Sequence, residues 1–75
     1  MSTNYQRLRA LRAAEYLADA ASARCAMRSH ALRHRIAVAE SDEKTAIQAK
    51  GLAVFYRDHA REYAQMADNI RKEVA

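Results

Sequence analysis

The sequence predicts an all-α fold, an antiparallel hairpin of two long helices at about residues 4–39 and 42–74, within a single domain that covers residues 1–75. Three observations predict it. The 75 residues contain no proline and one glycine, so little interrupts a helix. One polar cluster, AESDEKTA, lies near the middle of the chain. On both sides of this cluster, apolar residues recur three and four positions apart, which is helical spacing.

The first helix is predicted from the segment before the polar cluster. Nothing between residues 4 and 39 breaks a helix. Thr3 and Gln6 have the spacing of a capping box, in which the hydroxyl accepts a hydrogen bond from a first-turn amide and the glutamine reaches back to the cap. We therefore expect the helix to begin at about residue 4.

The turn is expected at about residues 40–43. Ser41 can cap the second helix, which places Asp42 and Glu43 in its first turn, where the positive end of the helix dipole favours carboxylates. A single helix that continues through the cluster is the alternative, because no Gly-Pro pair marks the turn. Gly51 costs about 1 kcal/mol inside a helix, and we expect it to kink the second helix or to permit close approach of the first.

Each predicted helix has an apolar stripe that can pack against the other. The stripe of the second helix consists of Ala49, Leu52, Phe55, Tyr56, His59, Tyr63, Met66, Ala67, Ile70 and Val74. The stripe of the first helix consists of Leu11, Ala14, Ala18, Ala21, Cys25, Leu32, Ile36 and Ala39. Folding at about residue 42 sets large residues against small ones, with Tyr63 near Ala21 and Met66 near Ala18. We expect these stripes to form the core.

The first helix carries a second line of residues, roughly opposite to its stripe. Four residues follow one another at intervals of eleven, which is almost three helical turns: Tyr5, Tyr16, Met27 and Val38. One partner helix cannot cover both sides, so we expect this line to be exposed. The residues predicted to bind a partner are those of the line and its flanks: Tyr5, Arg9, Arg12, Tyr16, Met27, His30 and His34.

Charge and composition restrict the partner and the compartment. The net charge is +4, and residues 1–40 carry all of it, which favours a partner with an acidic surface. The single cysteine cannot form an intrachain disulfide, which suits a reducing compartment. No signal peptide is evident, and the longest apolar run, residues 52–56, is far too short to cross a membrane. We expect a cytoplasmic protein without a membrane partner.

The sequence favours neither a metal site nor catalysis. His30 and His34 are four residues apart and could share a metal ion, but Cys25 points to the opposite side of the helix and no third ligand is near. Cys25 and His59 lie on the facing stripes and could approach each other. A two-helix hairpin, however, offers no cleft in which they could act. We therefore predict that the protein is not an enzyme and needs no cofactor.

The composition of the second line is typical of a protein interface, since aromatic residues, methionine and arginine are enriched in interface centres. We predict a homodimeric hairpin, assembled as a four-helix bundle, that binds and modulates another protein as an inhibitor, adaptor or chaperone. Small helical hairpins occur among secretion chaperones, toxin antidotes and phage-encoded inhibitors of host proteins, an analogy of fold alone. The alternative is a small nucleic-acid-binding protein, with Arg24, Arg28 and Arg35 reaching phosphates.

Overall fold

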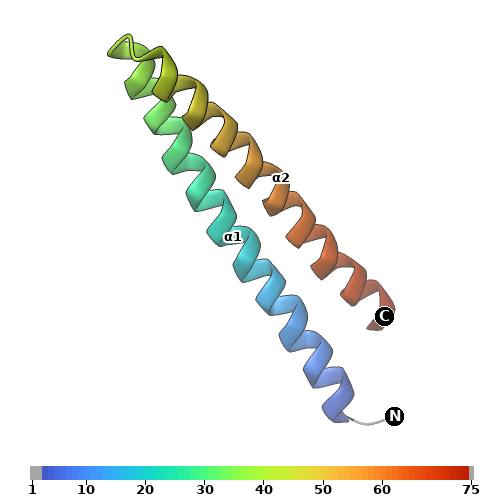
Figure 1. Cartoon of the computed structure of the whole chain (residues 1–75). Helices are drawn as coiled ribbons and strands as arrows, with labels where there is room; N and C mark the ends of the chain where they lie inside the picture. The colour runs from blue at the N-terminus through green and yellow to red at the C-terminus, as the bar shows by residue number, and fades with distance from the viewer. Residues whose placement is uncertain (1–2, 75) are drawn as a thin grey trace.

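Two antiparallel helices make up the described chain (Figure 1). The computed structural model describes residues 3–74, with side chains for residues 4–73. Helix α1 spans Thr3–Ala39 and helix α2 spans Glu43–Val74. The Cα atoms occupy a rod of 60 × 13 × 13 Å. The predicted all-α hairpin is confirmed, each boundary lies within one residue of its predicted place, and the uninterrupted helix is excluded. The predicted cap at Thr3 involves a side chain outside the described residues.

Ser41 and Asp42 make the turn between the helices. Ser41 has a φ of 59°. The amides of Ser41 and Asp42 donate to the carbonyls of Val38 (3.1 Å) and Ala37 (2.8 Å), which is the Schellman pattern that ends a helix. The Asp42 carboxylate then accepts from the Thr45 amide at 3.2 Å, so Asp42 caps α2. The prediction that Ser41 is the cap is therefore wrong by one residue, because Ser41 is held in the left-handed conformation that closes α1.

The helices pack along a seam with the spacing of a coiled coil. Covered or half-covered residues recur three and four apart in both helices, a repeat that keeps one face of each helix towards the other. In α1 the residues with this spacing are Arg9, Ala13, Tyr16, Ala20, Ala23, Met27, His30, His34 and Ala37, and Leu17 and Ala26 beside them are also half-covered. In α2 they are Ala46, Ala49, Ala53, Tyr56, Ala60, Tyr63, Ala67 and Ile70, and His59 and Ala64 beside them are also half-covered. The buried hydrophobic residues of the described chain are all alanines, whose small side chains allow two helix backbones to approach closely.

The predicted face of α1 is wrong. Leu11, Leu32 and Ile36, which were expected in the core, are 61%, 56% and 57% exposed. Ala18 and Ala21 are also exposed, so they cannot support Met66 and Tyr63 as predicted. The face of α2 is correct in its main residues, since Ala49, Tyr56, His59, Tyr63, Ala67 and Ile70 lie in or beside the seam. Leu52, Phe55 and Met66 are instead exposed at its margin.

The error arises because both sides of α1 carry apolar residues at helical spacing, so the spacing does not distinguish them. The second line has a different period from the seam. Residues eleven apart fall on one line only if the helix has about 3.67 residues per turn, whereas a seam with coiled-coil spacing has 3.5. The line therefore crosses the seam obliquely. Its ends, Tyr5 and Val38, are 49% and 58% exposed, while Tyr16 and Met27 in its middle are half-buried against α2.

Gly51 neither kinks α2 nor permits close approach of α1. It lies within the uninterrupted helix Glu43–Val74, and a Cβ atom added there would meet nothing within 4 Å. Its φ is not positive, so the backbone does not require glycine. The expectation for Gly51 is therefore wrong, because the residue lies on the side of α2 that faces away from the seam.

Candidate functional site

The middle of the predicted partner line contacts α2. The Tyr16 and Tyr63 rings stack with their centroids 6.3 Å apart. The His30 ring stacks almost parallel on Tyr56, with centroids 5.5 Å apart and planes inclined by 5°. The Nδ1 atom of His34 lies 2.9 Å from the Ala46 carbonyl oxygen, so that nitrogen carries the proton and donates. The expectation that these residues lie on an uncovered face is wrong, because the seam covers part of each.

The N-terminal part of the predicted line lies beside the C-terminal part of α2. The Tyr5 hydroxyl accepts a hydrogen bond from an Arg9 guanidinium nitrogen at 3.0 Å, and the guanidinium carbon lies 5.5 Å from the centre of the Tyr5 ring. Arg9 also forms an ion pair with Glu73. Arg9 therefore holds the two helix ends together, while Tyr5 and Arg12 are exposed and can still contact a partner.

The histidines and Cys25 are not gathered into a metal or nucleophile site. Within residues 3–74, no three His, Cys, Asp or Glu side chains come together in a way that could hold a metal ion. Cys25 is exposed on the side of α1 away from α2, so it does not approach His59. His59 instead pairs with Glu62 at 3.4 Å and meets the edge of Phe55 with centroids 4.3 Å apart.

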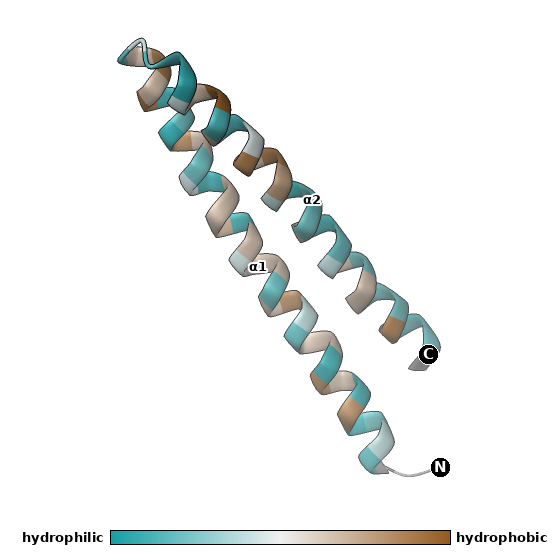
Figure 2. Cartoon of the chain, in the orientation of Figure 1, coloured by the Kyte–Doolittle hydropathy of each residue, from teal (hydrophilic) through white to brown (hydrophobic). Residues whose placement is uncertain are grey.

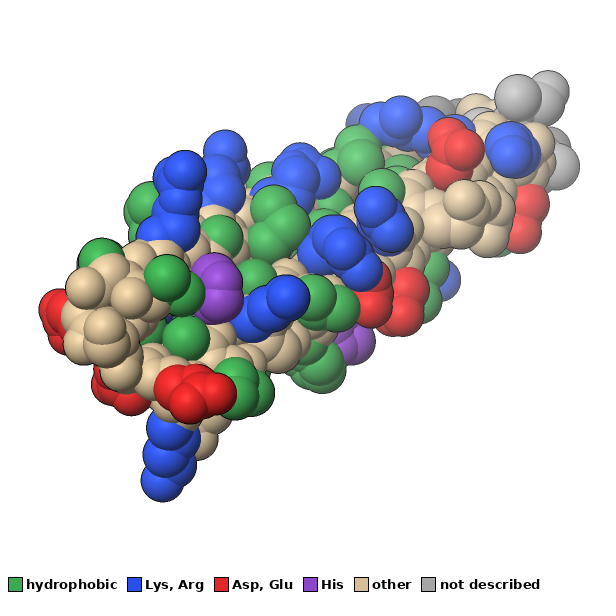
Figure 3. Space-filling view, turned by 90° about the horizontal axis from the view of Figure 1, so that it is seen from above, with side chains coloured by type: hydrophobic (Ala, Val, Ile, Leu, Met, Phe, Trp, Pro, Cys, Tyr) green, Lys and Arg blue, Asp and Glu red, His purple; other side chains and the backbone are tan. Residues whose placement is uncertain are grey.

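A basic groove runs along one side of the seam. It consists of two depressions that share Met27 and Arg57. Its complete lining is Arg24, Met27, Arg28, Ala31, His34, Arg35, Lys50, Ala53, Val54, Arg57, Ala60, Arg61 and Ala64. Six of these residues are lysine or arginine and none is acidic. Figure 3 shows Lys and Arg side chains recurring beside hydrophobic side chains along the rod.

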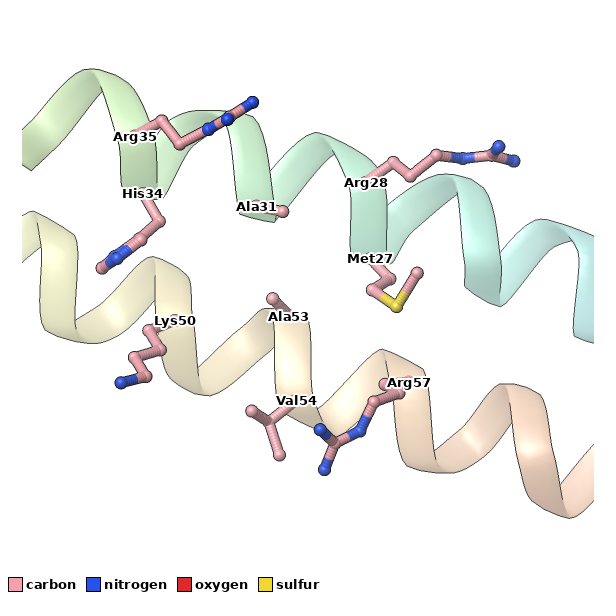
Figure 4. Close-up of a pocket in the computed structure, with 9 residues that line it drawn as sticks. All are labelled: Met27, Arg28, Ala31, His34, Arg35, Lys50, Ala53, Val54 and Arg57. Carbon is pink, nitrogen blue, oxygen red and sulfur yellow. The ribbon is translucent and has the colours of Figure 1, made fainter.

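The floor of the basic groove is apolar and its walls are charged. Figure 4 shows Met27, Ala31 and Ala53 between the two helices, with Arg28 and Arg35 extending from α1. Lys50, Val54 and Arg57 extend from α2 on the other side. This arrangement can hold apolar side chains of a bound segment between two rows of cations.

Most cations of the basic groove have no acidic partner within the described chain. Arg57 alone among the six forms an ion pair in residues 3–74, with its neighbour Asp58 at 3.4 Å. The other five are Arg24, Arg28, Arg35, Lys50 and Arg61. Like charges gathered along a groove raise the local concentration of an oppositely charged ligand and speed its association. The groove therefore attracts anionic groups.

The opposite side of the seam has a different character. A depression there, the aromatic groove, is lined by Asp19, Ser22, Ala23, Ala26, Phe55, Tyr56, His59 and Tyr63. It contains no lysine or arginine. Although serine, histidine and aspartate all line it, no hydrogen bond within the described residues joins His59 to Ser22 or Asp19. The connected pairs of a nucleophilic triad are thus not formed there.

Sequence reasoning named Met27 and His34 as partner-binding residues and Arg24, Arg28 and Arg35 as a row that could reach phosphates, but it did not place the α2 cations across the groove from them. The cations Arg24, Lys50 and Arg57 occupy the same position of the seven-residue repeat, beside the seam, in their respective helices. In an antiparallel pair, these positions of the two helices face each other across one side of the seam. The signal was therefore in the sequence, but it could be interpreted only after the correct face of α1 had been assigned.

The fold and the surface define the class of protein as a small antiparallel helical hairpin with a basic groove. No family model, curated protein or solved structure matches the chain. Within the described residues, neither helix contains a segment long and apolar enough to cross a bilayer.

Proposed function

We propose that the protein is a non-enzymatic, homodimeric binding protein that holds an acidic segment of another protein in its basic groove. The observation that carries this proposal is the combination of six cations with an apolar floor and no acidic residue in the lining. An amphipathic segment with carboxylates beside an apolar stripe complements both features, as helices bound in grooves commonly do. Binding of this kind would allow the protein to act as an inhibitor, adaptor or chaperone.

The apolar floor favours a protein ligand over nucleic acid. Phosphates would satisfy the cations but would leave Met27, Ala53 and Val54 without apolar contacts. Burial of such side chains contributes about 25 cal/mol per Å² of apolar surface removed from water. Nucleic acid is nevertheless the second candidate, because unpaired cations along one groove also suit a phosphate backbone.

Exposed apolar surface supports the homodimer. No large side chain of the described residues is fully buried, and eleven large hydrophobic residues are exposed. Exposed side chains of this kind are available to an interface, and a chain this short gains stability from association. The four-helix assembly and the cytoplasmic location are both parts of this proposal.

A matched pair of charge reversals tests the groove. Lys50 lines it, whereas Lys44 is exposed on the outer side of α2. The probe is a fluorescent synthetic peptide with a leucine stripe flanked by glutamates, and its affinity is measured by anisotropy. We expect Lys50→Glu to weaken binding by about tenfold or more and Lys44→Glu to change it by about twofold or less, because only Lys50 faces the bound segment.

A second variant separates the two candidate ligands. Val54→Gln removes an apolar side chain from the groove lining without changing the charge, so it should weaken peptide binding and leave the affinity for a short duplex DNA unchanged. Peptide affinity should also depend less steeply on salt than DNA affinity does. Equal peptide binding by the two lysine variants would exclude the basic groove as the site. Tight DNA binding that is insensitive to Val54→Gln would favour the nucleic-acid function.

A further inference from the structure

We propose that two copies of this chain associate through the outer side of α1, packed antiparallel about a two-fold axis between Ala21 and Ser22. The inference rests on the homodimer of the proposed function and adds the surface and orientation of its interface. The interface is separate from the basic groove, so the dimer would present two grooves.

The outer side of α1 is an apolar face directly opposite the seam. Leu11, Ala18, Cys25 and Leu32 recur every seventh residue and are all exposed. Because the seam has the same seven-residue repeat, these four residues keep pointing away from α2 along the whole helix. We call them the outer stripe. Leu11 and Leu32 are among the most exposed large hydrophobic residues of the described chain, at 61% and 56%.

The outer stripe is symmetrical about its centre. Its two large residues stand at the ends and its two small residues stand in the middle. Figure 2, which colours the residues of all sides of the helices by hydropathy, shows hydrophobic segments towards both ends of α1. An antiparallel second copy centred between Ala21 and Ser22 would place Leu11 opposite Leu32 and Ala18 opposite Cys25. This is the self-complementarity that a two-fold interface requires, since every contact between two different residues of the two copies is repeated by the symmetry. Leu11 of each copy therefore meets Leu32 of the other.

The small central residues determine how closely the copies can approach. Ala21, Ser22 and Ser29 flank the outer stripe and are exposed, so the backbones can approach over the centre of α1. The leucines then meet at both ends of a contact about 30 Å long, at 1.5 Å per residue. Hydrophobic ends around a small-residue centre therefore fix the register as well as the orientation.

Size measurement and disulfide trapping test the proposal. Light scattering on the full chain should give twice the 8.5 kDa chain mass at micromolar concentration. In the proposed dimer, equivalent cysteines at position 25 are about 10 Å apart along the helix axis, too far for a disulfide, which needs Cα atoms within about 7 Å. Mild oxidation should therefore leave the wild type without cross-links. Ala18→Cys should give a covalent dimer, because the new thiol faces Cys25 of the second copy.

Cysteines at neighbouring positions give the register. Ala14→Cys and Ala21→Cys, each with the native Cys25, would trap antiparallel dimers shifted along the axis, so both should cross-link much less than Ala18→Cys. Cross-linking of the wild type through Cys25 alone would indicate a parallel dimer or an antiparallel dimer centred on Cys25, and either would overturn the proposal. A dimer that none of the cysteines traps would overturn this interface while leaving the homodimer intact. A monomer would overturn both.

A matched pair of variants tests the contacts themselves. Leu32→Glu should raise the dimer dissociation constant by about tenfold or more, whereas Ile47→Glu, at an apolar position on α2 that is 66% exposed, should leave it unchanged. Equal weakening by both variants, or weakening by Ile47→Glu alone, would contradict the proposed surface.

Discussion

Asp42 and Ser41 show how single residues shape the connection between the helices. The Asp42 carboxylate accepts hydrogen bonds from Thr45, and Ser41 adopts a left-handed conformation with a φ of 59°. The first contact lowers the energy of the charged carboxylate at the positive end of α2. The second is unfavourable for any residue with a Cβ atom. The Asp42 hydrogen bonds and the Ser41 conformation each lead to a separate prediction.

The Asp42 cap should make stability depend on pH in the acid range. The Thr45 hydroxyl, followed by the Thr45 amide, holds the pKa of Asp42 below its usual 3.8. A lowered folded-state pKa means that the cap contributes fully above pH 3.8 and is lost as the pH falls through the folded-state value. Thermal melts should therefore show Asp42→Asn approaching the wild type below about pH 4. Thr45→Val, which lacks the hydroxyl, should move this loss to higher pH. A constant difference between wild type and Asp42→Asn would contradict the assignment.

Ser41→Gly should stabilise the hairpin. Glycine adopts the left-handed region at little steric cost, whereas an L-residue with a side chain is disfavoured there by about 1–2 kcal/mol. Part of that gain is offset by the greater freedom of glycine in the unfolded chain, so we expect about 0.5–1 kcal/mol. Urea denaturation measures the change. A destabilised Ser41→Gly variant would mean that the serine side chain contributes more than its backbone conformation costs.

At the scale of the elements, α1 has apolar residues on two opposite sides, and α2 has them mainly on one. This difference explains why the sequence identified the inner face of α2 and not that of α1. In α1, an alanine that faces α2 can be the immediate neighbour in sequence of an alanine that faces away. Ala20 is fully buried at 0% exposure, while Ala21 is exposed.

The same substitution at these two neighbours tests the face of α1. Ala20→Leu should lower the free energy of unfolding by about 1–3 kcal/mol, because the seam has no room for a larger side chain. Ala21→Leu should leave the hairpin nearly as stable as the wild type. Both variants should be melted at a concentration at which light scattering shows monomers, so that association does not contribute. The opposite ranking would restore the face that the apolar stripe first suggested.

At the scale of the whole molecule, two narrow helices leave eleven large hydrophobic side chains of the described residues exposed. Only alanines are buried among the hydrophobic residues of the described chain, so one hairpin has a thin core. Association through the outer stripe would cover its two leucines and leave the basic groove open to a partner. Stability and binding are then linked, because whatever associates with the folded state stabilises it.

Thermal stability should consequently rise with protein concentration. If the dimer unfolds to separate chains, each tenfold increase in concentration adds about 1.4 kcal/mol per dimer, which corresponds to a few degrees in the melting temperature. Calorimetry over a hundredfold range of concentration measures the effect. Leu32→Glu should abolish the dependence and Ile47→Glu should retain it. A wild-type melting temperature that stays constant would indicate a stable monomer.

The two helices and the place of the turn follow from the amino-acid sequence. The absence of proline, the polar cluster at residues 39–46 and the apolar repeat in each half are local signals, and helix formation depends on local hydrogen bonds. Even the shift of the cap from Ser41 to Asp42 is a change of one residue. The inner face of α2 was also predictable, because its apolar residues lie mainly on one side.

Which face of α1 meets α2 follows from the packing of the two helices and not from the sequence pattern. Both faces are apolar, so local patterning does not distinguish them. Close approach of two helices favours the face with alanine at Ala13, Ala20 and Ala23, where the backbones can meet, over the face with Leu11 and Leu32. That choice also placed the cations of both helices on one side of the seam. The basic groove therefore depends on pairing two helices, and its residues are far apart in the sequence.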